Sequence, residues 1–355
     1  MSSAPPMNWM IYGANGYTGE LIAREAVRRG LKPVLAGRSR DKIAPLAAEL
    51  GLEVRAFGLD DVAAAAAQIR GTGLVLHCAG PFSATAAPMM QACIRAGAHY
   101  LDITGEISVF EHAQTLDAQA RQAGVVVCSG VGFDVIPTDC VAAALKAALP
   151  DATHLALGFD SRSSMSPGTA KTSIEGMAQG GKVRRDGRIM SVPLAWRVRH
   201  IDFGDGVKPA MTIPWGDVST AFHTTGIPNI EVYIPGSMGM IRGAKAANLV
   251  RPLLGLQAVQ KFLKARIGKN VSGPDDSKRA GQSTHVWGEA RNAAGVVKTA
   301  RVRTENVYSL TITGALAVVE HLAQHSPEGG AYTPAKLVGF ELVSRLPGST
   351  AITVI

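Results

Sequence analysis

The segment Gly13-Ala14-Asn15-Gly16-Tyr17-Thr18-Gly19 constrains the fold of this 355-residue chain more than any other. It follows an apolar stretch that predicts a strand over 8–12 and precedes a predicted helix over 20–29. Gly13 permits a tight turn, Gly16 lets the backbone approach a pyrophosphate, and Gly19 packs the helix on the sheet. The helix N-terminus then offers N–H groups and partial positive charge to phosphates. The spacing G-x-x-G-x-x-G is therefore a variant of the dinucleotide-binding fingerprint, with an ordinary glycine-rich turn as the alternative.

The first 150 residues alternate short apolar strands with Ala-rich helices, which is typical of a doubly wound parallel sheet. Strands are predicted over 8–12, 33–36, 53–57, 74–78, 100–103 and 125–128, and helices over 20–29, 41–50, 61–70, 84–95 and 110–121. From about residue 151 the pattern changes to strands separated by turns rich in Gly, Pro and Ser, with strands predicted over 153–159, 195–203 and 296–304 and a helix over 316–323. The predicted fold class is α/β: an N-terminal Rossmann doubly wound parallel sheet, followed by a second α+β mixed-sheet domain.

Composition and charge exclude several classes of protein. Hydrophobic residues make up 46% and charged residues 18%, which argues against disorder. The four cysteines (Cys78, Cys93, Cys128 and Cys140) have no zinc-type spacing, and a disulfide framework is not expected. No signal peptide and no membrane-spanning apolar run is visible, so a cytoplasmic protein is expected, with a membrane-peripheral location as the variant.

Arg38 indicates which dinucleotide the turn would bind. It lies 25 residues after Gly13, at the end of the second predicted strand, and no carboxylate precedes it there. NAD-binding domains place an acid near this point to hold the ribose 2′-hydroxyl, whereas an arginine accommodates the 2′-phosphate of NADP. Arg38 with Ser39 therefore favours NADP, and a solvent-facing arginine is the alternative.

The segment His77-Cys78-Ala79-Gly80-Pro81-Phe82 closes the fourth predicted strand, at the sheet edge where such folds bind ligands. Small residues there let the chain pass close to the nicotinamide side of a cofactor, which makes Cys78, Ala79, Gly80 and Pro81 candidate cofactor contacts. His77 is more simply interpreted as a packed side chain than as an acid–base group.

Proton donors for a reaction at this edge include Asp102, Glu106, Asp134 and Asp139. Asp134 and Asp139 lie where the first domain hands over to the second, a usual place for an active site. Asp139 could instead cap a helix over 140–149. Lys171, in the polar turn 166–173, could pair with a carboxylate or phosphate, although an ordinary loop explains the same residues. Asp134, Glu106 and Lys171 are the catalytic candidates.

Two further spacings do not predict sites. Tyr332 and Lys336 match a Tyr-x-x-x-Lys pattern, but the proline between them would break the shared helix that this pattern needs. His321 and His325 could share a metal on a helix face, but no third ligand is evident, and no metal is expected.

The basic excess of the chain lies in its second half. Residues 1–150 hold 12 Lys/Arg and 13 Asp/Glu, and residues 151–355 hold the remaining 24 and 15. The stretch 241–270 is basic, rich in leucine and free of acids. It could cover a substrate cleft, bind a membrane surface, dock an acidic carrier protein, or be a solvated helix face. Nucleic-acid binding is disfavoured because no recognition motif appears, and a homodimer is plausible.

Taken together, the motifs GANGYTG, AGRS, CAGPF, YLDITGE and GFDVIPTD occur in the order seen in saccharopine dehydrogenase-like oxidoreductases, a group that includes the trans-acting enoyl reductases. SPGTAKTSIEGM and YTPAKLVGFELVSRL also resemble this family, so the similarity covers most of the chain. The resemblance implies a Rossmann domain over 1–130, a substrate or dimerisation domain over 131–305, and a segment over 306–355 that returns to the first domain.

By position, the resemblance also implies which residues line the cofactor: Gly13, Asn15, Gly16, Tyr17, Thr18, Arg38, Ala79, Gly80 and Pro81. The family often has Asn where this chain has His77. The activity expected is that of an NADP-dependent oxidoreductase, first for an apolar or acyl substrate with a carbonyl-activated C=C bond. The alternatives are a saccharopine-type imine or secondary-amine oxidoreductase and a non-catalytic NADP(H)-sensing protein.

Overall fold

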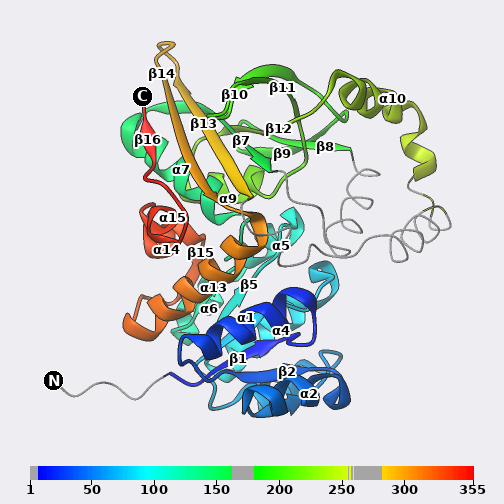
Figure 1. The fold of residues 1–355 in the computed structure, drawn as a ribbon, viewed down its shortest axis with the longest axis vertical. Coiled ribbons are helices and arrows are strands. Elements are labelled where there is room, and N and C mark those ends of the chain that lie inside the picture. The colour runs from blue at the N-terminus through cyan, green and yellow to red at the C-terminus, as the bar shows by residue number, and fades with distance from the viewer. Residues whose placement is uncertain (1–6, 162–179, 255, 257–258, 260–281) are drawn as a thin grey trace. The chain divides into compact units, whose positions relative to one another are not determined.

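The computed structural model describes residues 7–161, 180–254, 256, 259 and 282–355, without the side chains of 252–254 (Figure 1). The chain divides into two compact units. Unit 1 comprises Met1–Ile136 and Leu310–Gly339, and unit 2 comprises Pro137–Ser309 and Phe340–Ile355.

Unit 1 is built on a seven-stranded sheet A, in the order β15-β6-β5-β4-β1-β2-β3, in which every pair of neighbours is parallel. Its strands are β1 (Trp9–Tyr12), β2 (Val34–Gly37), β3 (Val54–Ala56), β4 (Leu74–His77), β5 (His99–Asp102), β6 (Val126–Cys128) and β15 (Gly330–Tyr332). Its helices are α1 (Tyr17–Arg28), α2 (Arg40–Leu50), α3 (Val62–Ile69), α4 (Phe82–Ala96), α5 (Ile107–Thr115), α6 (Asp117–Ala123), α13 (Val307–Gln324) and α14 (Pro334–Val338). The predicted parallel sheet is confirmed.

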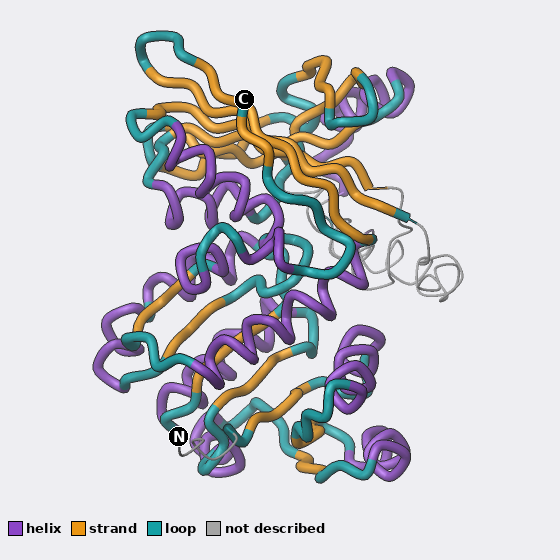
Figure 2. The backbone as a smooth tube through the Cα atoms, turned by 60° about the vertical axis from the view of Figure 1, so that its left-hand side comes forward, coloured by secondary structure: helices purple, strands orange, loops and turns teal. Residues whose placement is uncertain are grey.

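The core of unit 1 explains why its central strands read as continuous apolar runs. All four residues of β1 are buried, and so are all four of β4. Alternate strand residues face opposite sides of a sheet, so burial of every residue requires cover on both faces. Figure 2 shows sheet A between helices. Met10 and Tyr12 contribute to a core cluster with α3 and α4 on one face.

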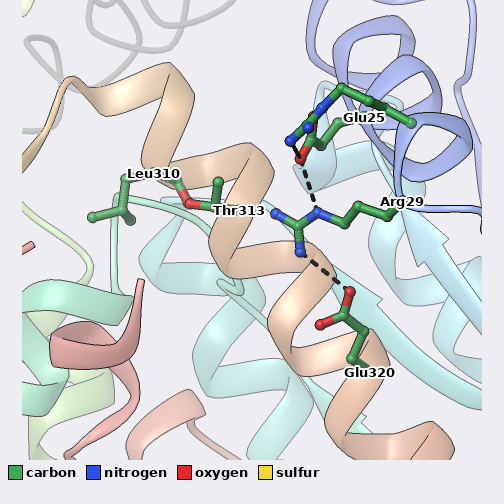
Figure 3. A network of polar contacts seen from close by, with 6 residues as sticks. Glu25, Arg29, Leu310, Thr313 and Glu320 are labelled. Carbon is green, nitrogen blue, oxygen red and sulfur yellow. Dashed lines mark hydrogen bonds and ion pairs between the residues drawn. The ribbon is translucent and has the colours of Figure 1, made fainter. Parts of the chain in front are cut away.

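Helix α13 carries the chain back from unit 2 and lies beside α1. Arg29 follows the last turn of α1 and donates to Glu25 Oε1 at 2.8 Å and to Glu320 Oε1 of α13 at 3.2 Å (Figure 3). After α13, β15 pairs with β6, with Ala331 opposite Val127. Segments about 200 residues apart therefore complete one sheet.

Unit 2 is built on a nine-stranded mixed sheet B, in the order β10-β11-β12-β7-β13-β14-β16, with β8 pairing β12 and β9. Its strands are β7 (Ala152–Ser161), β8 (Gly181–Arg185), β9 (Arg188–Val192), β10 (Val198–Asp202), β11 (Val207–Thr212), β12 (Asn229–Pro235), β13 (Ser283–Asn292), β14 (Val297–Glu305) and β16 (Thr353–Val354). Its helices are α7 (Ile136–Ala148), α9 (Asp217–Thr225), α10 (Met238–Leu254) and α15 (Leu342–Arg345). The predicted second domain with a mixed sheet is also confirmed.

Both faces of sheet B are packed. On one face α7 approaches β13 closely, because a Cβ at Gly288 would lie 2.6 Å from Val141 and 2.8 Å from Leu145 side-chain atoms. On the other face Phe203, Tyr233 and Trp287 form an aromatic core that is at most 3% exposed. Sheet B is therefore a core-forming element in its own right.

Several helix boundaries differ from the sequence prediction. The largest difference is at α13, which begins at Val307 and not at 316. The helix predicted over 110–121 is two helices, α5 and α6, which meet at Leu116. Helix α2 begins at Arg40, one residue before its predicted start, and Ser39 is its N-cap residue. Helix α7 begins at Ile136, so Asp139 lies in its first turn and does not precede it.

Candidate cofactor site

The glycine turn after β1 has the geometry that its sequence predicts. Gly13 has a φ of +88°, and a Cβ there would lie 2.7 Å from Ala79 N. A Cβ at Gly19 would overlap the carbonyl oxygen of Gly13. Side chains at Gly13 and Gly19 are therefore excluded by contacts with backbone, and the first turn of α1 lies directly against the end of β1.

The N-terminus of α1 has no side-chain cap. Gly16 is the N-cap residue, its backbone is extended, and as a glycine it has no side chain to accept a hydrogen bond from the first turn. Asn15 and Tyr17 beside it are exposed. A helix of 12 residues with an uncapped N-terminus presents N–H groups and a partial positive charge, which suit a phosphate.

The end of β2 adjoins this turn. A Cβ at Gly37 would lie 3.5 Å from Asn15 Oδ1. Arg38 follows, exposed, and the described part of the chain gives its guanidinium no hydrogen bond or ion pair. Burial raises the pKa of Tyr12, and the positive charge of Arg38 acts in the opposite direction, so Arg38 acts electrostatically at the end of β1. A cation with no partner at this position fits a 2′-phosphate.

The end of β4 packs on the same turn. A Cβ at Gly13 would lie 2.8 Å from the Cβ of Ala79, which is closer than two carbon atoms can pack. Gly80 and Pro81 are exposed, whereas Cys78 is partly buried and burial raises the pKa of its thiol. Sheet A reverses its winding between β1 and β4, and ligands of doubly wound sheets bind at this point.

Two acids that the sequence singled out hold backbone at the neighbouring strand ends. Asp102 is fully buried at the end of β5, and it accepts hydrogen bonds from Tyr100 Oη at 2.7 Å, Thr104 N at 3.0 Å and Gly130 N at 2.9 Å. Glu106 Oε1 accepts from Phe82 N, the first residue of α4, at 3.1 Å. Both carboxylates therefore orient loops at the carboxyl edge of sheet A.

Among the candidate acids, Asp134 has the properties that best suit an acid–base group. It follows β6, is partly buried, and its carboxylate lies against Gly105, where a Cβ would be 2.6 Å from Asp134 Oδ2. Burial raises the pKa of Asp134 to about 6, so this group titrates near neutral pH.

The other candidates lie elsewhere. Asp139 belongs to unit 2, where it is fully buried and accepts from Thr224 Oγ1 at 2.5 Å. Lys171 lies outside the described residues. Tyr332 ends β15 and Lys336 lies in α14, so the two share no helix. The rings of His321 and His325 stack at 4.4 Å.

The described residues offer neither a metal-ligand cluster nor a membrane-spanning helix. No group of three or more His, Cys, Asp or Glu in the described part of the chain could hold a metal ion. Within the same residues, no helix has the length and hydropathy needed to cross a membrane.

Sequence reasoning missed one residue of this region. Thr85, in the first turn of α4, donates from Oγ1 to Ala79 O at 2.7 Å and lies 3.0 Å from His77 Nε2. The only signal in the sequence is a hydroxyl residue four residues after Pro81, in an Ala-rich helix start, and Ser83 is a second hydroxyl residue there.

The glycine turn and the start of α1 lie at the switch point of a parallel sheet, and next to them stands an arginine that the described residues leave without an ion pair. This arrangement is typical of a dinucleotide-binding domain. Residues 9–128 match the family model described as the saccharopine dehydrogenase NADP binding domain. This match and the geometry agree that unit 1 contains an NADP-binding domain.

Relatives of known name resemble the same part of the chain. The human saccharopine dehydrogenase-like oxidoreductase is 30% identical over 160 residues, which cover 38% of this chain and 36% of that protein. The trans-acting enoyl reductase of Mycobacterium ulcerans (strain Agy99) is 32% identical over 144 residues, covering 37% of this chain and 33% of that protein. The chain thus spans about a third of the length of these relatives.

The fold of the whole chain resembles a solved structure. Apo saccharopine dehydrogenase (L-Glu forming) from Saccharomyces cerevisiae aligns with 98% of this chain and 100% of its own, with a TM-score of 0.66 and 11% identity. At this identity the match shows a common fold of Rossmann-type sheet and mixed-sheet domain.

Proposed function

We propose that the chain is an NADP-dependent oxidoreductase that transfers hydride from NADPH to an apolar, acyl-type substrate whose C=C bond is activated by a carbonyl group. The observation that carries the cofactor half of this proposal is the exposed Arg38, which has no ion-pair partner among the residues that the structure describes and lies beside the glycine turn of an NADP-binding domain. The substrate half is supported by the similarity to the trans-acting enoyl reductase.

The residues of the candidate site suit the cofactor. The uncapped start of α1 and the glycine turn would hold the pyrophosphate, Arg38 and Ser39 the 2′-phosphate, and the Cys78–Pro81 segment the nicotinamide side. When bound, the cofactor supplies the hydride. The protein's task is to orient it and to deliver a proton.

Asp134 is the proton donor in this proposal. Reduction of an activated C=C bond adds a hydride to one carbon and a proton to the other, and the protonated Asp134 carboxyl supplies that proton. A pKa of about 6 keeps a useful fraction of the group protonated near neutral pH. As an acid it must be protonated, so turnover should fall about tenfold per pH unit well above pH 6.

The test is a titration of the purified protein with NADPH, NADH, NADP and NAD, followed by fluorescence, and then a screen of enoyl thioesters, imines and aldehydes for NADPH consumption. We expect preferential binding of the phosphorylated pair and turnover of an enoyl substrate that Asp134→Asn lowers at least tenfold. Turnover of imines alone would replace the substrate class with the saccharopine type. Tight binding with no turnover of any class would favour an NADP(H)-sensing protein, and no binding at all would refute the proposal.

A further inference from the structure

His77 carries a buried polar atom without a partner. The side chain is 0% exposed at the end of β4, and its ring lies 5.5 Å from that of Tyr12 and 5.3 Å from that of Phe82. Its Nε2 lies 3.0 Å from Thr85 Oγ1, but its Nδ1 has no hydrogen-bond partner within the described structure. Buried polar atoms are almost always paired, so this exception needs a reason.

The hydrogen bonds of Thr85 fix the tautomer of His77. Thr85 Oγ1 lies 2.7 Å from Ala79 O and 3.0 Å from Pro81 O, and both carbonyl oxygens can only accept. The single hydroxyl hydrogen is therefore directed to a carbonyl, and Oγ1 must accept from His77. His77 Nε2 carries the hydrogen, and the unpartnered Nδ1 is the bare nitrogen.

The hydrogen bonds from His77 to Thr85 and from Thr85 to Ala79 O fix the orientation of the Ala79–Gly80 peptide plane. The Ala79–Gly80 peptide is trans and planar, so the N–H of Gly80 points away from the carbonyl that Thr85 holds. Gly80 is exposed, and in the part of the chain that the structure describes its N–H has no recorded partner. Ala79 itself lies against Gly13. An oriented backbone donor thus stands beside the glycine turn.

We propose that His77 and Thr85 are positioning residues that orient the Ala79–Gly80 peptide, so that the Gly80 N–H donates a hydrogen bond to an oxygen on the nicotinamide half of NADP(H). This inference rests on the proposed function. The carboxamide and the nicotinamide ribose both offer such acceptors. Glu106 holds the same turn at its C-terminal side, because its carboxylate accepts a hydrogen bond from Phe82 N. The unpaired Nδ1 is the cost of placing an Nε2 donor at Thr85, which an apolar side chain could not provide.

The test compares matched variants by NADPH titration and thermal unfolding. Thr85→Val removes the hydroxyl while keeping the shape, and Thr85→Ser keeps it. His77→Leu removes the Nε2 donor, and His77→Gln carries an amide N–H to nearly the same point. We expect NADPH dissociation constants about tenfold higher for Thr85→Val and His77→Leu, and within about twofold of wild type for the Ser and Gln variants.

The melting temperatures of the variants distinguish a positioning role of His77 from a role in stabilising the fold. Because His77→Leu also removes the unpaired Nδ1, its melting temperature should equal or exceed that of wild type while its affinity falls. The double variant should bind as weakly as either single one, since both act through one carbonyl. Wild-type affinity in Thr85→Val and His77→Leu, equal losses in the Ser and Gln variants, or additive losses in the double variant would each overturn the inference. Wild-type protein that does not bind NADPH would instead overturn the proposed function.

Discussion

Arg38 differs from the arginines of α1 in its surroundings. Arg24 and Arg28 are each paired with a glutamate, whereas the described residues leave the guanidinium of Arg38 without a carboxylate. A charge left unpaired at the surface keeps its full capacity to bind an anion. The preference for NADP, which is inferred from Arg38, is therefore a property that one side chain should control.

We expect Arg38→Ala to weaken NADPH binding about 10- to 100-fold, the value of one or two charge-assisted hydrogen bonds, and to leave NADH binding nearly unchanged. Fluorescence titration with both dinucleotides measures this. Arg38→Lys, which keeps the charge but not the planar fork, should fall between the two. An equal loss for NADPH and NADH would remove the assignment of Arg38 to the 2′-phosphate.

Asp134 makes a prediction about stability as well as catalysis. Burial raises its pKa from 3.8 to about 6, so the folded state holds the proton to higher pH than the unfolded state does. Its contribution is therefore fully present below about pH 4 and is lost as pH rises through 6. At pH 8 we expect Asp134→Asn to be more stable than wild type by up to about 3 kcal/mol, and at pH 4 nearly equal.

Urea unfolding at pH 4 and pH 8 checks this sign. Asp117→Asn is the matched control, because the hydrogen bond from Arg121 lowers the pKa of that exposed carboxyl. Its variant should be no more stable than wild type at pH 8. A destabilised Asp134→Asn at pH 8 would show that the carboxylate is held by contacts stronger than its desolvation.

The residues of the candidate site differ in how well they can be predicted from the sequence. The glycines and Arg38 were predictable because a strand, a turn and a helix start stand next to one another along the chain. Thr85 was not predictable, because its partners are two backbone carbonyls of the preceding turn and the ring of His77. Asp102 was predicted as an acid at a strand end, but its role in holding Gly130 N was not. A carboxylate that orients a remote loop leaves no local spacing to find.

At the scale of elements, the β1–α1 connection depends on its glycines for two different reasons. A Cβ at Gly13 would collide with the backbone of Cys78 and Ala79, and its φ of +88° disfavours side chains. A Cβ at Gly16 would approach only Gly13 O, at 3.2 Å, and the φ there is −83°. Gly13 is therefore needed for folding, and Gly16 for access of a ligand to the helix start.

We expect Gly16→Val to lower NADPH affinity more than tenfold while the melting temperature changes by only a few degrees. Gly13→Val should lose about 2 kcal/mol or more of folding free energy, from overlap and backbone strain together. Titration and thermal unfolding of the two variants separate these effects. Normal NADPH binding by Gly16→Val would contradict the assignment of the turn to the pyrophosphate.

Most strands of sheet A begin and end within one or two residues of their predicted bounds, because strands buried on both faces are uninterrupted apolar runs between glycines and polar turns. Helix starts were less accurate. The start of α7 was placed late because Ile136 and Pro137 resemble loop residues, although proline suits the first turn of a helix. The break at Leu116 carries no proline or glycine that would signal it.

At the scale of the whole molecule, unit 1 is made from two segments separated by all of the central strands of unit 2. Pairing between β6 and β15, more than 200 residues apart, has no local signal in the sequence. Leu316 and Val319 of α13 are at most 2% exposed, so the second segment contributes core as well as an edge strand.

We therefore expect residues 1–136 alone to lack a cooperative thermal transition, because β6 would pair only with β5 and the contacts of α13 would be lost. Joining residues 1–136 to 310–339 through a flexible Gly/Ser linker should restore cooperative unfolding and NADPH binding. Circular dichroism and NADPH titration of the two proteins measure both effects. Cooperative folding of residues 1–136 alone would show that α13 and β15 are not required for the folding of unit 1.

The same division fixes an order of events during synthesis. When the ribosome has made the six strands from β1 to β6, the cofactor domain still has an open edge at β6, and such an edge can pair with other chains. That edge stays open while the whole of sheet B up to β14 is being translated, and it closes only when β15 emerges. The nascent chain thus carries a sheet with an aggregation-prone open edge while about 200 residues are added, and chaperones that shield strand edges should engage it until β15 has been made.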